Sequence, residues 1–302
     1  MSKKARGNIL LLLTAVIWGA AFVAQSEGMK YVGPFTLQTS RFFLAGAVLL
    51  PVIAVCDRKG LTPNRPRSSA DRRRQGGVML VCGTLLFAAS TLQQYGLLYT
   101  SVGKSGFITS LYIVLVPILG ILSGKKAAPL VWCGVALAVA GLYFLCVSGG
   151  LSFNPGDLLT LGCALLFSLH ILFIDRFGAR VGGVRLACGQ FFVCSALSFV
   201  GMLLAETPSW AGILSCWLPI VYAGVFSGGV GYTLQILGQR DTQPAVASLL
   251  MSLESFFAAL FGWLLLGQAL TPRELFGCFL MLAAVVLAQL PDRRAAAQSL
   301  RR

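Results

Sequence analysis

Two side chains of opposite charge, Arg41 and Glu254, lie deep inside long apolar stretches of the sequence. A charged group at mid-bilayer costs about 2.5–3.5 kcal/mol on insertion scales, so such residues are by default functional candidates. Glu254 lies about 11 residues into its apolar stretch, or ~16 Å along a helix. Its carboxylate could accept a proton or hold a cationic ligand. The alternative is a structural ion pair or a neutral, hydrogen-bonded acid.

Arg41 lies at a similar depth when it is counted from the opposite membrane face. It is about seven residues, or ~10 Å, into its own apolar stretch. One hypothesis is that Arg41 and Glu254 pair across the two halves of the chain in one state and separate in another. Under the alternative, Arg41 only holds helix ends together.

His170 is the single histidine of the chain and also lies within an apolar stretch. Imidazole titrates near neutral pH, so this residue could relay protons. Nothing in its neighbourhood marks it for that role, and a packed, neutral histidine is the competing interpretation.

Uncharged polar and aromatic residues recur in the apolar stretches and could complete a substrate cavity with Arg41, His170 and Glu254. Gln38 and Arg41 are three positions apart and therefore share a helix face. The alternative for each of these residues is a hydrogen bond between helices. The members of this set are Trp18, Gln38, Gln93, Gln94, Tyr112, Gln190, Tyr232 and Gln235.

Motifs for other chemistry are missing from the sequence. Gly103-Lys104-Ser105 resembles the end of a phosphate loop, but Leu98 stands where that motif needs a glycine. No H-E-x-x-H, G-x-S-x-G or C-x-x-C is present, and the nine cysteines occur singly. The sequence therefore predicts no enzyme, no cofactor and no metal site, and energy for any transport must come from gradients.

The elements that must position these residues are ten apolar stretches. The chain has 302 residues, of which 57% are hydrophobic and 11% are charged. A helix of roughly 20 apolar residues crosses a bilayer, and continuous apolar runs argue against alternating strands. We therefore expect an all-α integral membrane protein with spans 8–25, 34–55, 76–98, 104–123, 129–148, 157–174, 184–205, 217–238, 243–266 and 272–290.

The basic residues alternate with the predicted spans. Of the 24 Lys and Arg residues, 20 fall in the two termini and in alternate connections, all on one side of the membrane. The positive-inside rule places this side, with both termini, in the cytoplasm of a bacterial inner membrane protein. The net charge of +14 is thus explained without a nucleic-acid partner.

The second half of the chain repeats the first. Gln93/Gln235, Ser110/Ser252 and Gly120/Gly262 share a constant offset of 142 positions. Since five spans are odd in number, the second copy must insert upside down, as inverted repeats do. We expect a first repeat over 1–148 with a cytoplasmic loop at 56–75, and a second repeat over 149–290. A basic cytoplasmic tail, 291–302, follows them.

One segment of the eighth predicted span is rich in glycine. Gly224, Gly228, Gly229 and Gly231 lie within eight residues of each other. Small residues allow helices to pack closely, and a broken segment that lines a cavity is the alternative.

Several blocks resemble the EamA repeat of the drug/metabolite transporter superfamily. They are Trp18-Gly19, Arg41-Phe42, the run 110–145, and the run from Ala247 to Gly267 that is followed by Leu270-Thr271-Pro272. The resemblance covers roughly residues 8–290. It implies a ten-helix exporter or permease with a central cavity, with the fifth and tenth helices at the periphery.

The chain departs from this family pattern at two places. Glu254 lies near the position where members usually have a proline in the ninth helix. Gly267-Gln268 replaces the usual Gly-Glu at the end of that helix. The first departure places a carboxylate inside the membrane, and the second removes a charge at its interface.

Together these features predict a secondary transporter that works by alternating access. Its cargo would be a small metabolite such as an amino acid, and family analogy favours export over uptake. Its other partners would be the lipid bilayer and protons, which would be coupled to transport through Glu254. An uncoupled facilitator or channel for small solutes is the alternative. A scaffold or intramembrane enzyme would need a reactive constellation or a large domain outside the bundle. The oligomeric state stays open.

Overall fold

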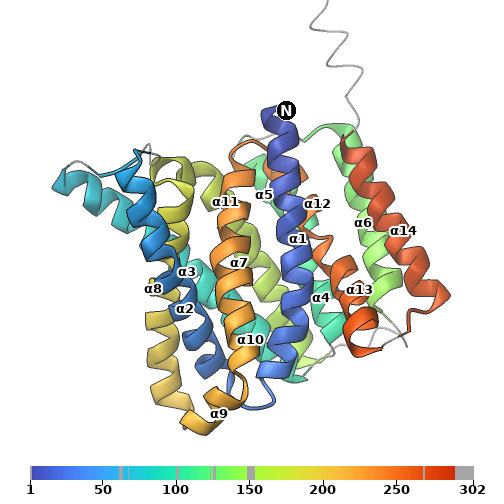
Figure 1. Ribbon diagram of the computed structural model, residues 1–302. Helices are drawn as coiled ribbons and strands as arrows, with labels where there is room; N and C mark the ends of the chain where they lie inside the picture. Colours follow the sequence, from blue (N-terminus) through green and yellow to red (C-terminus); the bar gives the residue numbers. More distant parts are fainter. Residues whose placement is uncertain are drawn as a thin grey trace, which may run out of the picture.

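The chain folds as a bundle of helices (Figure 1). The computed structural model describes residues 2–60, 64–66, 68–99, 102–122, 124, 127–147, 154–267 and 269–289, and none of these lies in a strand. The first half contains α1 (Lys3–Gly28), α2 (Pro34–Arg58), α3 (Ser69–Tyr99), α4 (Val102–Ser110), α5 (Tyr112–Leu122) and α6 (Pro129–Cys146). The predicted tail at 291–302 and part of the loop at 56–75 lie outside the described residues.

The second half has more interruptions. It contains α7 (Pro155–Phe177), the 3₁₀ turn η1 (Gly178–Arg180), α8 (Gly183–Ala205), α9 (Trp210–Ser215), α10 (Trp217–Val221) and the π-helix η2 (Tyr222–Tyr232). The remaining helices are α11 (Thr233–Gln239), α12 (Pro244–Met251), α13 (Glu254–Leu266) and α14 (Pro272–Gln289).

Eight helical stretches of the described chain are long and apolar enough to cross a membrane. A further apolar helix, Pro129–Leu145, is shorter, and α14 coincides with the last predicted span. Large apolar side chains remain exposed on the outside of the bundle, for example Leu122 and Leu204, which are 81% and 84% exposed. In a bilayer such side chains face lipid, so this is the fold of a multi-pass membrane protein.

Two of the spanning stretches are interrupted at equivalent positions. Leu111 separates α4 from α5, and Ser252 with Leu253 separates α12 from α13. Leu111 and Leu253 are related by the 142-residue offset of the repeat. The Ser252 hydroxyl donates to the Leu249 carbonyl, a local bond that competes with the regular helical pattern.

The glycine-rich segment forms a π-helix that packs closely on α2. A Cβ atom on Gly224 would lie 2.9 Å from the Arg41 carbonyl oxygen, and one on Gly228 would lie 2.6 Å from Cβ of Ala45. The prediction of close helix packing is therefore confirmed, and the segment is continuous rather than broken. Wide turns of this kind are frequent at functional sites.

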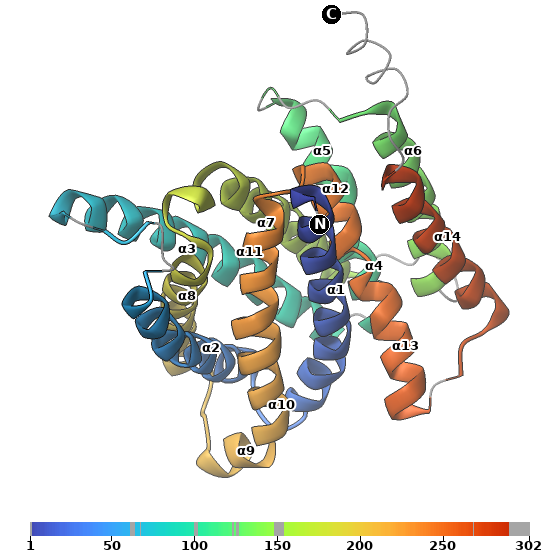
Figure 2. The same ribbon diagram turned by 45° about the horizontal axis from the view of Figure 1, so that its top comes forward.

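Helices α6 and α14 lie side by side at one edge of the bundle (Figure 2). A Cβ atom on Gly141 would lie 2.9 Å from the Gly277 carbonyl, and one on Gly277 would lie 2.6 Å from the Gly141 carbonyl. The two backbones thus meet at these glycines. The central pocket described below is lined by residues of α1 to α5, α7, η2 and α11 to α13.

Candidate functional site

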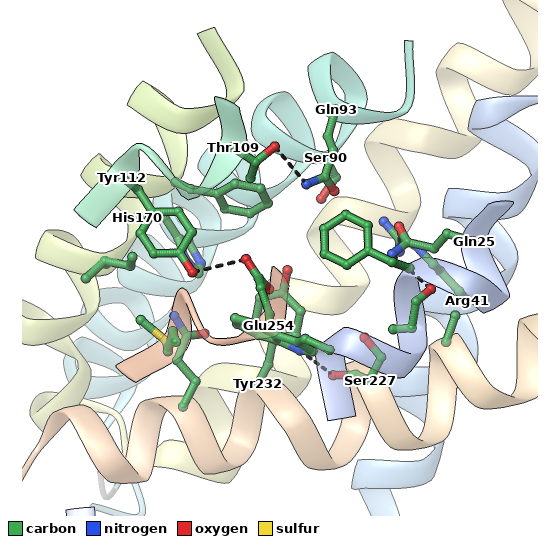
Figure 3. A pocket seen from close by; sticks show the side chains of 18 of the residues that line it. Gln25, Arg41, Ser90, Gln93, Thr109, Tyr112, His170, Ser227, Tyr232 and Glu254 are labelled. Atoms are coloured by element: carbon green, nitrogen blue, oxygen red, sulfur yellow. Dashed lines mark hydrogen bonds between the residues drawn. The ribbon is translucent and has the colours of Figure 1, made fainter. Parts of the chain in front are cut away.

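A pocket lies at the centre of the bundle, where both halves of the chain contribute side chains (Figure 3). Its free volume is about 50 Å³. Small-molecule sites usually measure about 300–1,000 Å³, so a metabolite enters only if the pocket widens. Eight of the eleven predicted site residues line it: Trp18, Arg41, Gln93, Tyr112, His170, Tyr232, Gln235 and Glu254.

Arg41 lies on α2 and is buried, with 5% of its surface exposed. Its Nη1 donates to Oε1 of Gln25 at 2.5 Å, and Nε2 of Gln94 donates to the same oxygen at 2.7 Å. Its guanidinium carbon lies 4.5 Å from the centre of the Phe42 ring. The immediate hydrogen-bond partner of this cation is therefore a neutral amide.

Glu254 is the first residue of α13 and is also buried, with 6% of its surface exposed. The Tyr112 hydroxyl donates to its Oε1 at 3.0 Å. The two hydroxyls of Ser110 and Ser255 lie 2.9 Å apart beside this contact. These two contacts thus join the break between α4 and α5 to the start of α13.

The predicted pairing of Arg41 with Glu254 does not occur in this structure. Each of the two has its own hydrogen-bond partner, and they form no ion pair with each other. Figure 3 shows Arg41 with Gln25 at one side of the pocket, whereas Glu254 lies nearer its middle and turns towards Tyr112 on the opposite side. The cation and the acid therefore occupy separate places in one pocket.

His170 is fully buried on α7, and its Nε2 lies 2.9 Å from Oε1 of Gln190. Because an amide oxygen only accepts hydrogen bonds, Nε2 carries the proton in this pair. The Cys82 thiol lies 2.9 Å from the same oxygen. Nδ1 has no partner, which agrees with a neutral ring that packs edge-on against Tyr232.

Aromatic rings form part of the pocket wall. Trp18 and Tyr232 have ring centroids 4.7 Å apart, and Nε1 of Trp18 donates to the Ser227 carbonyl at 3.2 Å. A Cβ atom on Gly231 would lie 2.7 Å from that indole nitrogen. The π-helix η2 therefore determines where the indole lies.

Three predicted site residues are absent from the pocket lining. Gln38 donates to Thr91 and Ser198, Gln94 donates to Gln25, and Gln190 accepts from His170. All three are buried between helices. In this structure they connect helices, which was the alternative interpretation from the sequence.

The sequence interpretation missed Gln25, the residue that contacts Arg41. It lies near the end of α1, seven positions after Trp18, and so on the same face of that helix. This spacing was the available signal. Ser90, Thr109 and Ser227 also line the pocket and were not predicted.

A second, wider cavity of about 700 Å³ includes Lys3, the first residue of α1, in its wall. Its wall includes Lys3, Asp175, Arg240 and Asp241. Asp241 also pairs with Arg6 at 2.7 Å. Helices α5 and α12 contribute to both cavities, since Tyr112 and Met251 line the first while Pro117 and Pro244 line the second.

Among the described residues no group of three or more His, Cys, Asp or Glu side chains is placed to hold a metal ion. The eight cysteines whose side chains are described have free thiols. Most of them are buried within the bundle.

The chain resembles known transporters over nearly all of its length. A model of the EamA-like transporter family matches residues 5–147 and again residues 154–290. An uncharacterized transporter of Archaeoglobus fulgidus is 33% identical over 291 residues, which are 95% of this chain and 87% of that protein. The uncharacterized inner membrane transporter YedA of Escherichia coli is 25% identical over 91% of this chain and 88% of its own.

Two further similarities are more limited. The threonine/homoserine exporter RhtA of Escherichia coli is 29% identical over 177 residues, 57% of this chain and 58% of that protein. A protein of known crystal structure superposes with a TM-score of 0.80, covering 96% of this chain and 99% of that one at 22% identity. The latter similarity concerns the fold.

Proposed function

Because the chain belongs to the EamA-like transporter family of the drug/metabolite transporter superfamily, we propose that it is a secondary transporter that exports small metabolites by alternating access. The observation that carries this proposal is the central pocket, to which both halves of the chain contribute and which holds one buried cation and one buried acid. Substrate sites of transporters lie near the membrane midplane at the interface of two repeats.

The proposed architecture has ten spans arranged as two inverted five-helix repeats, 1–148 and 149–290. The double match of the family model supports it. So do contacts between equivalent residues, since Phe42 stacks on Phe191 and Phe43 packs edge-on against Phe192. Equivalent residues meet in this way when a pseudo-two-fold axis passes between them.

In the proposed orientation both termini face the cytoplasm. The alternation of basic connections supports this orientation. The wide cavity beside Lys3 and Arg240 would then be the cytoplasmic vestibule. Reporter fusions at the two termini test the orientation, because a periplasmic phosphatase is active only on the outer side.

The cargo that we favour is an amino acid or a compound of similar size and polarity. The similarity to RhtA, which is named a threonine/homoserine exporter, supports this class. Trp18 and Tyr232 provide apolar surface beside the polar groups of the pocket. Gln38, Gln94 and Gln190, the predicted residues outside the pocket lining, would support the site by connecting the helices that form it.

Metabolite profiling tests the proposal. Cells that lack the protein and cells that overproduce it are compared for every small metabolite inside the cells and in the medium. We expect at least one metabolite to move from cells to medium when the protein is present. If the distribution of every metabolite between cells and medium is the same in the two strains, the proposal that the protein exports metabolites is wrong.

A second candidate is an uncoupled facilitator. It is favoured if movement of the cargo follows its own gradient and ignores the proton gradient. In the coupled mechanism that we propose, Glu254 takes up a proton when the cargo leaves. The buried carboxylate at the crossing of two interrupted helices supports this choice.

A further inference from the structure

The Arg41 guanidinium has no anionic partner within the described part of the chain. Its one side-chain hydrogen bond goes to the amide oxygen of Gln25, and its Nε has no partner although it is buried. Buried charges in proteins are generally paired with an opposite charge, because an unpaired buried charge is costly. The site therefore lacks an anion that would compensate its charge.

Among the described residues, Glu254 is the only carboxylate that lines the pocket, and it has a different partner. Glu254 accepts from Tyr112 at the other side and forms no ion pair with Arg41. Phe42 and Ser227 are among the neutral residues that line the pocket with Arg41. Since none of the described residues supplies an anion to Arg41, a bound ligand is the natural source of one.

The amide of Gln25 shows where an anionic oxygen would bind. Two donors from different helices, Nη1 of Arg41 and Nε2 of Gln94, converge on its Oε1 within 2.7 Å. An oxygen that accepts from two such donors occupies the place that a carboxylate oxygen would take. A carboxylate in this place can also accept from the neighbouring Nη2 of Arg41, since the two Nη groups of a guanidinium donate two parallel bonds to a carboxylate.

We propose that Arg41, Gln25 and Gln94 form a carboxylate site, and that a carboxylate on the cargo displaces the Gln25 amide from Arg41. This inference rests on the proposed function for its cargo. A phosphate dianion fits less well, because the pocket offers one cation and places the acid Glu254 on its other side. A zwitterion with a carboxylate towards Arg41 and an ammonium towards Glu254 matches both ends.

Replacement of Gln25 by Glu tests the site without loss of volume. The new carboxylate would pair with Arg41 and compete with the cargo, while a buried ion pair keeps the fold intact. We expect at least a tenfold loss of the export rate, because the cargo would lose its charge-assisted hydrogen bonds to Arg41. Gln75→Glu makes the same change at a residue that bonds the Asn64 and Arg180 carbonyls outside the pocket, and it should export as the wild type does.

The set of compounds that the wild type exports provides a second test of the carboxylate site. Every compound that it exports should carry a carboxylate. Export of a compound without any anionic group, or of phosphate esters alone, would overturn the carboxylate site and leave the transporter proposal standing. Unchanged export by the Gln25→Glu variant would also overturn it, because a purely structural Arg41 tolerates an added ion pair.

Binding to the purified protein gives an answer even if no export is found. The probe is sodium butyrate, compared with sodium chloride at equal ionic strength, and the readout is the thermal unfolding midpoint in detergent. Butyrate should raise the midpoint of the wild type but not that of Gln25→Glu or Arg41→Gln, because a ligand that binds only the folded state stabilises it. No rise for the wild type would overturn the site whether or not the protein transports.

Discussion

The Tyr112 hydroxyl donates a hydrogen bond of 3.0 Å to Glu254, and each of these residues is the first residue of a helix that follows an interruption. They occupy equivalent positions of the two halves, 142 residues apart. Ser110 and Ser255 add a second contact beside them. The two interrupted helices are thus joined at their breaks, which short backbone hydrogen bonds bridge, such as those from Leu111 to the Ile108 carbonyl and from Leu253 to the Leu250 carbonyl.

Replacement of Tyr112 by Phe should weaken this crossing. The ring stays in place, but the buried Glu254 carboxyl group loses its donor. We expect a loss of about 1–3 kcal/mol in the free energy of unfolding, the cost of leaving a buried polar group unsatisfied. Thermal unfolding in detergent measures it, and an unchanged midpoint would show that the bond contributes nothing.

Replacement of Glu254 by Gln should uncouple the proposed transport from protons. Glutamine keeps the shape and can still accept from Tyr112, but it cannot take up a proton. In wild-type proteoliposomes, acid on the side that receives the cargo should accelerate transport, because protons then enter against the cargo. The variant should lose this acceleration yet still exchange cargo between the two sides at equal pH.

The outcome of that experiment separates the two candidate functions. If the Glu254→Gln variant responds to the pH gradient as the wild type does, another group carries the proton. If neither protein responds, the facilitator is the better description. The exchange measurement serves as the control for folding and for cargo binding.

Gly19 on α1 should not tolerate a side chain. A Cβ atom there would lie 2.5 Å from Cβ of Phe257 and 2.8 Å from the Ala258 nitrogen, so α13 would have to move. Overpacking of this kind costs about 1–3 kcal/mol, and we expect Gly19→Ala to lower the unfolding midpoint accordingly.

Gly76 provides the matched control for Gly19. It lies inside α3, and no atom would approach a new Cβ within 4 Å. Because alanine is a better helix former, Gly76→Ala should stabilise the protein by roughly 0.5–1 kcal/mol. Equal effects of the two substitutions would show that the contact between α1 and α13 is looser than described.

Glu206 should stabilise the start of α2. Its carboxylate accepts from the backbone nitrogens of Phe35 and Thr36 at 2.7 and 2.9 Å, which are free donors at the beginning of that helix. Loss of such a cap costs about 0.5–2 kcal/mol, so Glu206→Ala should lower the unfolding midpoint.

A second acid serves as the reference for the cap. Glu27 forms an exposed pair with Lys30 at 2.7 Å, and exposed pairs contribute about 0–1 kcal/mol. Glu27→Ala should therefore change the midpoint by much less than Glu206→Ala does. A larger effect at Glu27 would contradict the assignment of Glu206 as the cap.

The sequence predicted the helical membrane fold and most of the pocket for physical reasons. Long apolar runs require helices, and polar residues within such runs are expensive, so Arg41, His170 and Glu254 stood out. The partner of Arg41 was not predictable in the same way. Whether Arg41 meets Gln25 or Glu254 depends on how far each helix is rotated and on where η2 forces α1 and α2 to lie. The interruption before Glu254 gave no strong local signal either, since Ser252 and Leu253 are compatible with a helix.

The small free volume of the central pocket also has an electrical consequence. Moving one elementary charge across 100 mV releases about 2.3 kcal/mol, so an energised membrane drives protons through any continuous file of water. The central pocket has a free volume of about 50 Å³. Its walls are aromatic rings and polar groups that already hold hydrogen bonds. A free volume of that size leaves room for only a few water molecules at this point of the bundle, which works against such a file.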